Sequence, residues 1–80
     1  MFFTYILHSE KIDRYYIGHS QNIANRLIKH NNGKVKSTKA GAPWKCVYFE
    51  SFETRSEAFN REMEIKKKKS KRYITNLIQK

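Results

Sequence analysis

The N-terminal residues carry the pattern of apolar and aromatic positions that is typical of a β-hairpin. Residues 2–8 (FFTYILH) are rich in aromatic and β-branched side chains and predict one strand, and residues 14–18 (RYYIG) predict a second. The polar segment between them, SEKID, has the composition of a turn. We therefore expect antiparallel pairing, with Tyr16 and Gly18 on one face of the second strand because side chains alternate.

The pattern changes to helical spacing after this hairpin. Apolar residues recur three and four positions apart, at Ile23, Ala24, Leu27 and Ile28. Either Ser20 or Asn22 can cap the start of this helix with its side-chain oxygen. Residues 31–33 (NNG) are typical of a helix end, so the helix is expected to stop there.

A loop and a third strand follow. Residues 33–43 (GKVKSTKAGAP) contain glycine, serine, threonine and three lysines without an acid, which predicts a loop. Residues 44–52 (WKCVYFESF) predict a strand of regular alternation. One face of that strand should carry Trp44, Cys46, Tyr48 and Phe52, and the other Lys45, Val47, Phe49 and Ser51.

Two helices complete the chain. Residues 53–69 predict a helix with Thr54 or Ser56 as its N-cap and Glu57 in its first turn. Ser70 can cap a last short helix over residues 71–80. The elements therefore follow the order β-β-α-β-α-α, and the length predicts a single domain over residues 1–80.

Charge changes the picture most. The chain has 17 Lys and Arg residues against seven Asp and Glu, a net charge of +10 on 80 residues. So basic a protein attracts polyanions, which makes nucleic acid the first expectation. An anionic membrane surface comes second, and a basic protein that is merely soluble is the remaining alternative.

Cysteine and hydropathy indicate where the protein works. Cys46 is the single cysteine, so no disulfide can form within the chain, which fits the reducing cytosol and predicts a cytoplasmic protein. No apolar run approaches the ~18 residues of a membrane span. The N-terminus lacks the positive start and the small-residue cleavage site of a signal peptide. Neither a membrane nor a disulfide partner is expected.

Lysines concentrate in two segments. A near-continuous basic run consists of Lys66, Lys67, Lys68, Lys69, Lys71 and Arg72, and the loop adds Lys34, Lys36 and Lys39. Such side chains bind phosphates without recognising sequence, and no module for base recognition is evident. The alternative for the run is a solvated helix face.

Glu62 stands out among the acids. At about 100° per residue it lies on one stripe with Ala58 and Ile65, whereas Glu57 and Glu64 point toward solvent. A carboxylate on the core-facing side is costly unless it is paired or bound to a metal. Helix geometry alone leaves both alternatives open, a metal ligand or half of a salt bridge with an internal Arg or Lys.

Arg26 and His30 lie four residues apart, so they are neighbours on one flank of the first helix. There they can overlook a cleft or form an ordinary solvated flank. The strand tyrosines can be plain core residues, which is the commoner role of an aromatic in a strand. The sequence contains no glycine-rich phosphate loop, CxxC pair, HExxH or GxSxG motif.

These residues together resemble the GIY-YIG nucleases. The YIG half is intact as residues 16–18, and Tyr5 is the tyrosine of the other half, where Phe3 and Thr4 stand in place of Gly and Ile. The remaining motif positions match in order and spacing: Ser20, Arg26, His30, Arg61-Glu62 and Ile65-Lys66. The chain is most similar to the small stand-alone members that look like the N-terminal nuclease domain of the excinuclease C subunit.

The resemblance implies an α+β fold, with a small three-stranded antiparallel sheet flanked by helices, and metal-dependent cleavage of phosphodiester bonds. It implies a single Mg²⁺ or Mn²⁺ ion on Glu62. Tyr5 or Tyr16 would orient the attacking water or take its proton, and Arg26 would meet the charge that develops on the phosphoryl oxygens, with His30 assisting. DNA is favoured over RNA as the substrate, with repair or recombination as the pathway.

Two alternatives remain at this stage. One is a non-catalytic nucleic-acid-binding module of the same fold, and the other is a basic partner of a ribonucleoprotein assembly. The complete set of Tyr16, Arg26, His30 and Glu62 favours the nuclease, because an inactive relative would be free to lose one of them.

Overall fold

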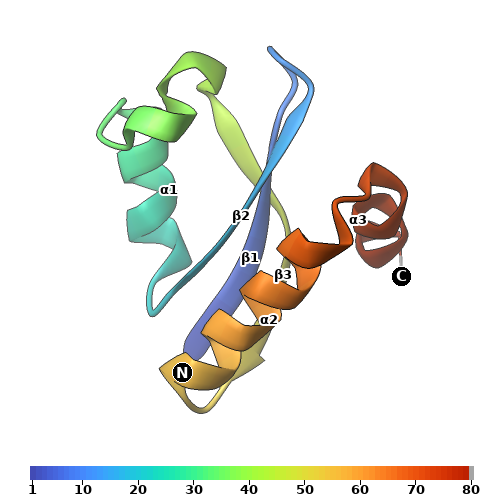
Figure 1. Cartoon of the computed structure of the whole chain (residues 1–80). Helices are drawn as coiled ribbons and strands as arrows, with labels where there is room; N and C mark the ends of the chain where they lie inside the picture. Colours follow the sequence, from blue (N-terminus) through green and yellow to red (C-terminus); the bar gives the residue numbers. More distant parts are fainter. Residues whose placement is uncertain (80) are drawn as a thin grey trace.

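The computed structural model describes residues 1–79, which form a three-stranded antiparallel sheet with helices on both faces (Figure 1). The elements in chain order are β1 (Phe2–Ser9), β2 (Arg14–Ser20), α1 (Ile23–Asn31), the 3₁₀ helix η1 (Lys36–Gly41), β3 (Trp44–Phe52), α2 (Arg55–Lys68) and α3 (Lys71–Ile78). The predicted α+β class and the order β-β-α-β-α-α are confirmed. The segment expected to be only a loop contains η1.

The strand order is β2-β1-β3, so β1 is the central strand and β2 an edge strand. The register of the hairpin places Tyr5 opposite Gly18 and Thr4 opposite His19. Because side chains alternate, Tyr5 and Gly18 lie on one face of the sheet, and Thr4 and His19 on the other. Ile17 and His19, the chain neighbours of Gly18, therefore point toward the opposite face of the sheet.

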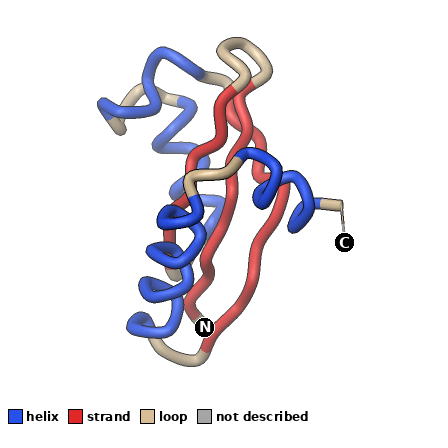
Figure 2. The backbone as a smooth tube through the Cα atoms, turned by 45° about the vertical axis from the view of Figure 1, so that its right-hand side comes forward, coloured by secondary structure: helices blue, strands red, loops and turns tan. Residues whose placement is uncertain are grey.

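Each face of the sheet has its own core. Tyr5, Leu7 and Trp44 form a buried cluster on the face covered by α1 and η1. Ile6 and Ile17 pack on the other face with three residues of α2 and α3, namely Ile65, Ile74 and Leu77. Figure 2 shows the sheet running between α1 and the pair α2 and α3.

The regular alternation predicted for β3 is wrong at one point. Ile6 pairs with Tyr48, but the next residue, Leu7, pairs with Cys46, so Val47 is an extra residue in a β-bulge. The bulge turns Val47 and Tyr48 toward the same core, and Cys46 packs against the opposite one. Alternation cannot reveal a bulge, because both sides of the insertion are apolar.

The helix starts follow the predicted capping residues. Asn22 rather than Ser20 caps α1, and Thr54 rather than Ser56 caps α2 in a capping box with Glu57. Ser70 caps α3 as expected. Within residues 1–79, no helix combines the length and the apolar character that crossing a bilayer requires.

Two sets of contacts fix the helices over the sheet. The Thr4 hydroxyl donates a hydrogen bond of 2.7 Å to the carbonyl of Ala58, which holds α2 against the central strand. On the other face, the Asn31 side chain bonds both the amide and the carbonyl of Trp44, and the Trp44 indole donates to the Thr38 carbonyl at 2.7 Å. These bonds tie the end of α1 and η1 to β3.

Candidate active site

Gly18 supplies space rather than backbone freedom. A Cβ atom at this position would lie 2.7 Å from the phenol oxygen of Tyr5 and 3.2 Å from the ring of Tyr16. The Tyr5 side chain, which is only 1% exposed, therefore lies directly over the edge strand at the glycine. The YIG glycine and the two motif tyrosines thus form one packed unit.

His30 is fully buried beneath these tyrosines, so it neither overlooks an open cleft nor lies on a solvated flank, the two alternatives that the sequence left open. Its Nδ1 lies 2.7 Å from the Thr38 hydroxyl, which in turn donates to the Val35 carbonyl, so His30 Nδ1–H is the donor to Thr38. His30 Nε2 is then an acceptor, 3.4 Å from the Tyr5 hydroxyl. Burial, together with the nearby Arg26 charge, lowers the pKa of His30 and favours this neutral form.

The inner face of α1 accordingly differs from the predicted stripe. Ile23 and Leu27 are half-buried as expected, but Ala24 is exposed and Ile28 is 57% exposed. His30 takes the inward position instead, because Thr38 of η1 offers it a hydrogen-bond partner.

The pKa of Tyr5 is influenced by several of the residues that the sequence predicted for the site. Burial raises the pKa of the Tyr5 phenol, the neighbouring Arg26 guanidinium offsets part of that rise, and the Tyr16 phenol and the Glu62 carboxylate add to it. Tyr16 is half-buried, and its ring centroid lies 4.8 Å from that of His30. Tyr5, Tyr16 and Gly18 therefore share one face at the β2 edge strand, with Arg26 beside the Tyr5 phenol and His30 behind the tyrosines, whereas Glu62 approaches β2 from the face that α2 covers.

Glu62 reaches this edge from α2. The buried residues of that helix are Ala58, Glu62 and Ile65, the stripe that the sequence predicted. Glu62 Oε1 lies 2.6 Å from His19 Nδ1, and Glu62 Oε2 lies 2.6 Å from Lys66 Nζ. In this structure the carboxylate is thus one half of a salt bridge, and its partners are a histidine of β2 and a lysine one turn along α2.

His19 is a site residue that sequence reasoning missed. Its ring packs edge-on against Phe59, with centroids 5.6 Å apart, and holds the Glu62 carboxylate from the β2 side. The signal was present in the strand alternation. His19 shares a face with Ile17, and that face is the one that α2 covers.

Glu62 stays the predicted ligand for a divalent cation of the Mg²⁺ type. Within residues 1–79 no group of three or more His, Cys, Asp or Glu side chains is placed to hold one ion. Mg²⁺, however, takes only one or two carboxylates and keeps several waters. The Lys66 side chain, 43% exposed, already places a positive charge on Glu62 and has room to swing into solvent. Glu62 is the residue that would hold the ion.

A basic cleft of about 350 Å³ opens beside this cluster. The residues that line it come from the end of β2, the start of α1 and the start of α2: His19, Ser20, Gln21, Asn22, Asn25, Arg26, Lys29 and Arg55. Three of them are permanent cations and none is an acid. Lys29 and Arg55 were not predicted as binding residues, because each is isolated in sequence from the lysine-rich segments.

The two lysine-rich segments lie apart. Lys34, Lys36 and Lys39 lie at η1 on one face of the sheet, and the run from Lys66 to Arg72 lies at the junction of α2 and α3 on the other (Figure 1). Three members of the run have partners: Lys66 binds Glu62, Lys71 binds Asp13 at 2.8 Å, and Lys68 lies over the Tyr73 ring. Lys67, Lys69 and Arg72 are exposed. Their role in binding nucleic acid stays a prediction.

Comparison with known proteins identifies the family of this chain. The GIY-YIG catalytic domain family matches residues 1–75. The chain belongs to the GIY-YIG family. The matching model describes a catalytic domain of a nuclease family.

Small relatives named UPF0213 are similar to this GIY-YIG domain. A UPF0213 protein of Staphylococcus saprophyticus is 52% identical over 52 residues, which cover 64% of this chain and 63% of that protein. That match spans less than two thirds of the relative's own length. A UPF0213 protein of Listeria monocytogenes is 40% identical over 78 residues, 96% of this chain and 86% of the relative. The closer likeness to the excinuclease C nuclease domain stays a prediction.

A solved structure supports the same fold. The solution NMR structure of a UPF0213 protein from Bacillus halodurans superposes with a TM-score of 0.59 at 30% identity, covering 99% of this chain and 84% of that one. The three-stranded sheet with its flanking helices is therefore shared by relatives of this GIY-YIG domain.

Proposed function

We propose that the protein is a metal-dependent endonuclease that hydrolyses phosphodiester bonds of nucleic acid, with DNA favoured over RNA. One observation carries the proposal. A carboxylate (Glu62) reaches the β2 edge strand from one face, an arginine (Arg26) and two tyrosines (Tyr5 and Tyr16) lie at the same strand on the other, and a cleft whose charged walls are all basic opens beside them. Phosphodiester hydrolysis needs a metal ligand, a cation for the phosphoryl oxygens and a group that handles the proton of the attacking water.

Arg26 is placed to stabilise the transition state. Its guanidinium lies beside the Tyr5 phenol and also lines the basic cleft, so it connects the phosphate-binding surface with the reacting groups. A planar, permanently charged donor that is fixed in advance suits the charge that grows on the phosphoryl oxygens. Lys29 and Arg55 would hold the neighbouring phosphates in the same cleft.

The two tyrosines have different roles in this proposal. Tyr5 is 1% exposed and burial raises its pKa, so it is unsuited to accept a proton from a water near neutral pH. Tyr16 is half-buried on the same face and is accessible to a water. We assign Tyr16 the contact with the attacking water, and Tyr5 the positioning of Tyr16 and Arg26.

His30 is a positioning residue in this scheme. As the acceptor for the Tyr5 hydroxyl proton, it fixes the direction of that hydroxyl and leaves the oxygen lone pairs free for Arg26. Glu62 would hold a single Mg²⁺ or Mn²⁺ ion, which would supply charge neutralisation and leaving-group stabilisation when bound. Occupation of Glu62 by metal requires that Lys66 withdraw.

The deciding experiment incubates the purified protein with supercoiled plasmid, branched DNA and RNA, in Mg²⁺, in Mn²⁺ and in EDTA. Cleavage in either metal but not in EDTA is expected, with a loss of about 10³-fold or more in Glu62→Gln, because metal catalysis supplies several kcal/mol. Glu64→Gln is the matched control, an exposed acid of the same helix, and should cleave like the wild type. No cleavage by the wild type in any metal would leave the non-catalytic binding module as the better assignment. Equal cleavage by Glu62→Gln would remove Glu62 as the metal ligand.

A further inference from the structure

A second pocket, of about 440 Å³, lies next to the Glu62 cluster on the α2 side of the sheet. It opens between the start of β2, the end of α2 and the start of α3. Its floor is apolar, with Ile17, Ile74 and the half-buried ring of Tyr15. Its volume falls within the range of pockets that bind small ligands. The proposed catalytic scheme does not use it.

The rim of this pocket is basic. Arg14, Lys66, Lys69 and Lys71 line it, and the one acid among the lining residues is Asp13. The Asp13 carboxylate is already bound by Lys71 at 2.8 Å and by His8 at 3.1 Å. A ligand that enters therefore meets an excess of positive charge above an apolar floor.

Lys69 supports a binding role for the rim. It ends α2 in the left-handed conformation, with φ 47° and ψ 37°, a position where glycine is the usual residue. A lysine here carries a backbone cost that glycine would avoid, and its side chain adds a charge to the rim of the pocket. The backbone alone gives no reason for a lysine.

We propose that this pocket binds an unpaired nucleotide of the nucleic-acid substrate, with its base on the apolar floor beside Tyr15 and its phosphates on the rim cations. The proposal rests on the proposed nuclease function and names its substrate class, a nucleic acid with a single-stranded stretch beside the cut. Aromatic floors combined with basic rims are the recurrent way to bind single strands, and each stacked base contributes about 1–3 kcal/mol.

The position of the pocket agrees with that substrate. Lys66 belongs to both sites, since it binds Glu62 and lines the pocket. Along β2, Ile17 of the pocket floor and His19 of the Glu62 cluster are two residues apart, about 6.6 Å at strand rise. The base in the pocket and the phosphate at Glu62 therefore belong to nearby nucleotides. A base reaches such a pocket only out of the stack, which costs least when it is unpaired.

The test compares binding of two DNA duplexes of the same sequence, one blunt and one with a single-stranded overhang of about five nucleotides, a length in the range of single-strand sites. Binding is measured in EDTA, and the overhang carries 2-aminopurine as a fluorescent base. An RNA overhang forms a second arm. The wild type should bind the overhang duplex about tenfold more tightly than the blunt one, with a change in 2-aminopurine fluorescence.

The decisive variant is Arg14→Gln with Lys69→Gly, which removes two rim charges while glycine suits the left-handed position. This variant should lose both the preference for the overhang duplex and the fluorescence change, whether the overhang is DNA or RNA. The control, Lys11→Gln with Lys67→Gln, loses the same charge outside this pocket and should weaken both duplexes equally. A preference that survives in the pocket variant, or is absent in the wild type, would overturn the proposal.

The outcomes separate the two proposals. Pocket-dependent binding without cleavage in any metal would support the pocket and refute the nuclease function. Metal-dependent cleavage of blunt and overhang duplexes at equal rates and affinities would support the nuclease function and overturn the pocket.

Discussion

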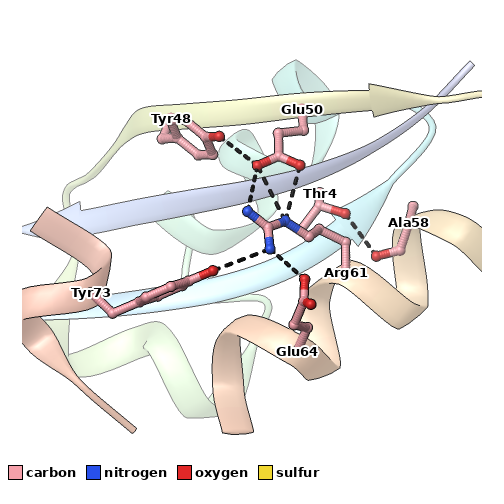
Figure 3. A network of polar contacts seen from close by, with 7 residues as sticks. All are labelled: Thr4, Tyr48, Glu50, Ala58, Arg61, Glu64 and Tyr73. Carbon is pink, nitrogen blue, oxygen red and sulfur yellow. Dashed lines mark hydrogen bonds and ion pairs between the residues drawn. The ribbon is translucent and has the colours of Figure 1, made fainter. Parts of the chain in front are cut away.

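Arg61 and Glu62 are neighbours on α2, yet their side chains lead to opposite edges of the sheet, Arg61 toward β3 and Glu62 toward β2. Arg61 donates to both oxygens of Glu50 at 3.0–3.2 Å, and also to Glu64 and to the Tyr73 hydroxyl (Figure 3). Glu50 also accepts from the Tyr48 hydroxyl. The guanidinium therefore joins α2, β3 and α3, and its donors are used within the protein.

The Glu62 cluster is built differently. His19 and Lys66 take two of the roughly four positions at which a carboxylate can accept, and Arg26 lies nearby on the other side of the β2 edge. One acid thus has a histidine and a lysine as its partners, and it lies beside an open basic cleft. The two clusters teach that pairing alone does not identify a structural ion pair. A network that is satisfied within the fold stabilises the fold, whereas one with spare acceptor positions and a surplus of charge is suited to ligands.

After the Glu62→Gln loss described above, the next largest effect that we predict concerns Arg26, which lies beside the Glu62 cluster. Arg26→Lys keeps the charge but loses the planar fork of donors, so the single-turnover cleavage rate should fall about 10²-fold or more. The melting temperature and the affinity for DNA at low salt should change little. Single-turnover rates in Mg²⁺ and Mn²⁺ measure the loss of cleavage. Thermal unfolding measures the melting temperature, and a binding titration measures the affinity. A Lys variant within about twofold of the wild-type rate would assign Arg26 to phosphate binding alone.

The next effect concerns the Arg61 network, whose partners all lie within the fold. Arg61→Leu leaves Glu50 without its main partner, and the free energy of unfolding should fall by about 2 kcal/mol. That is less than the 3–5 kcal/mol of a fully buried pair, because Arg61 and Glu50 are 19% and 25% exposed. Urea denaturation measures the change.

Two variants sharpen the Arg61 experiment. Glu50→Leu combined with Arg61→Leu should recover part of the loss, since apolar replacement of both members of an ion pair costs less than removal of one member. Glu62→Gln without metal should cost less than Arg61→Leu, because Lys66 is free to turn into solvent. A larger loss of stability in Glu62→Gln than in Arg61→Leu would reverse the assignment of the two clusters.

The helix that carries both clusters was predictable from the sequence. Its buried stripe of Ala58, Glu62 and Ile65 follows from helical periodicity, and its cap from a threonine three residues before a glutamate. The same periodicity could not decide whether Glu62 is a metal ligand or half of a salt bridge, because its partner His19 is 43 positions away in the sequence. Local pattern places a side chain on a face, but only the tertiary fold supplies its partner.

His30 shows the same limit on the other face. Helix spacing left His30 either overlooking a cleft or on a solvated flank, whereas it is fully buried and the apolar Ile28 is the exposed residue. The burial of His30 depends on Thr38 from η1, in a segment without periodicity, and on the Tyr5 hydroxyl from β1. The bulge at Val47 escaped notice for a similar reason, since a run of apolar residues hides an insertion.

The third prediction uses the buried histidine. The folded-state pKa of His30 is lowered, so below about pH 6.5 the unfolded state binds the proton more readily. The stability that His30 contributes is therefore complete above that pH and is lost as the pH falls toward the folded-state value. His30→Gln should flatten the decline between about pH 6.5 and 5 by up to about 1.4 kcal/mol per pH unit. Urea denaturation at several pH values gives the slopes, and parallel slopes for the two proteins would mean that His30 titrates normally.

The smallest effect concerns the exposed lysines, which belong to neither cluster. Lys67→Ala combined with Lys68→Ala should weaken binding equally on all DNA sequences, because phosphate contacts carry no sequence information. The slope of log Kobs against log salt should flatten by up to about 0.9 for each lost contact. Titrations at several salt concentrations, with two unrelated duplexes, measure both effects. Lys68 also lies over the Tyr73 ring at 5.5 Å, so a melting curve must show that the variant remains folded. If the slope and the low-salt affinity both stay at wild-type values, the duplex does not touch this segment, and the cleft of Arg26, Lys29 and Arg55 is left as the phosphate-binding surface.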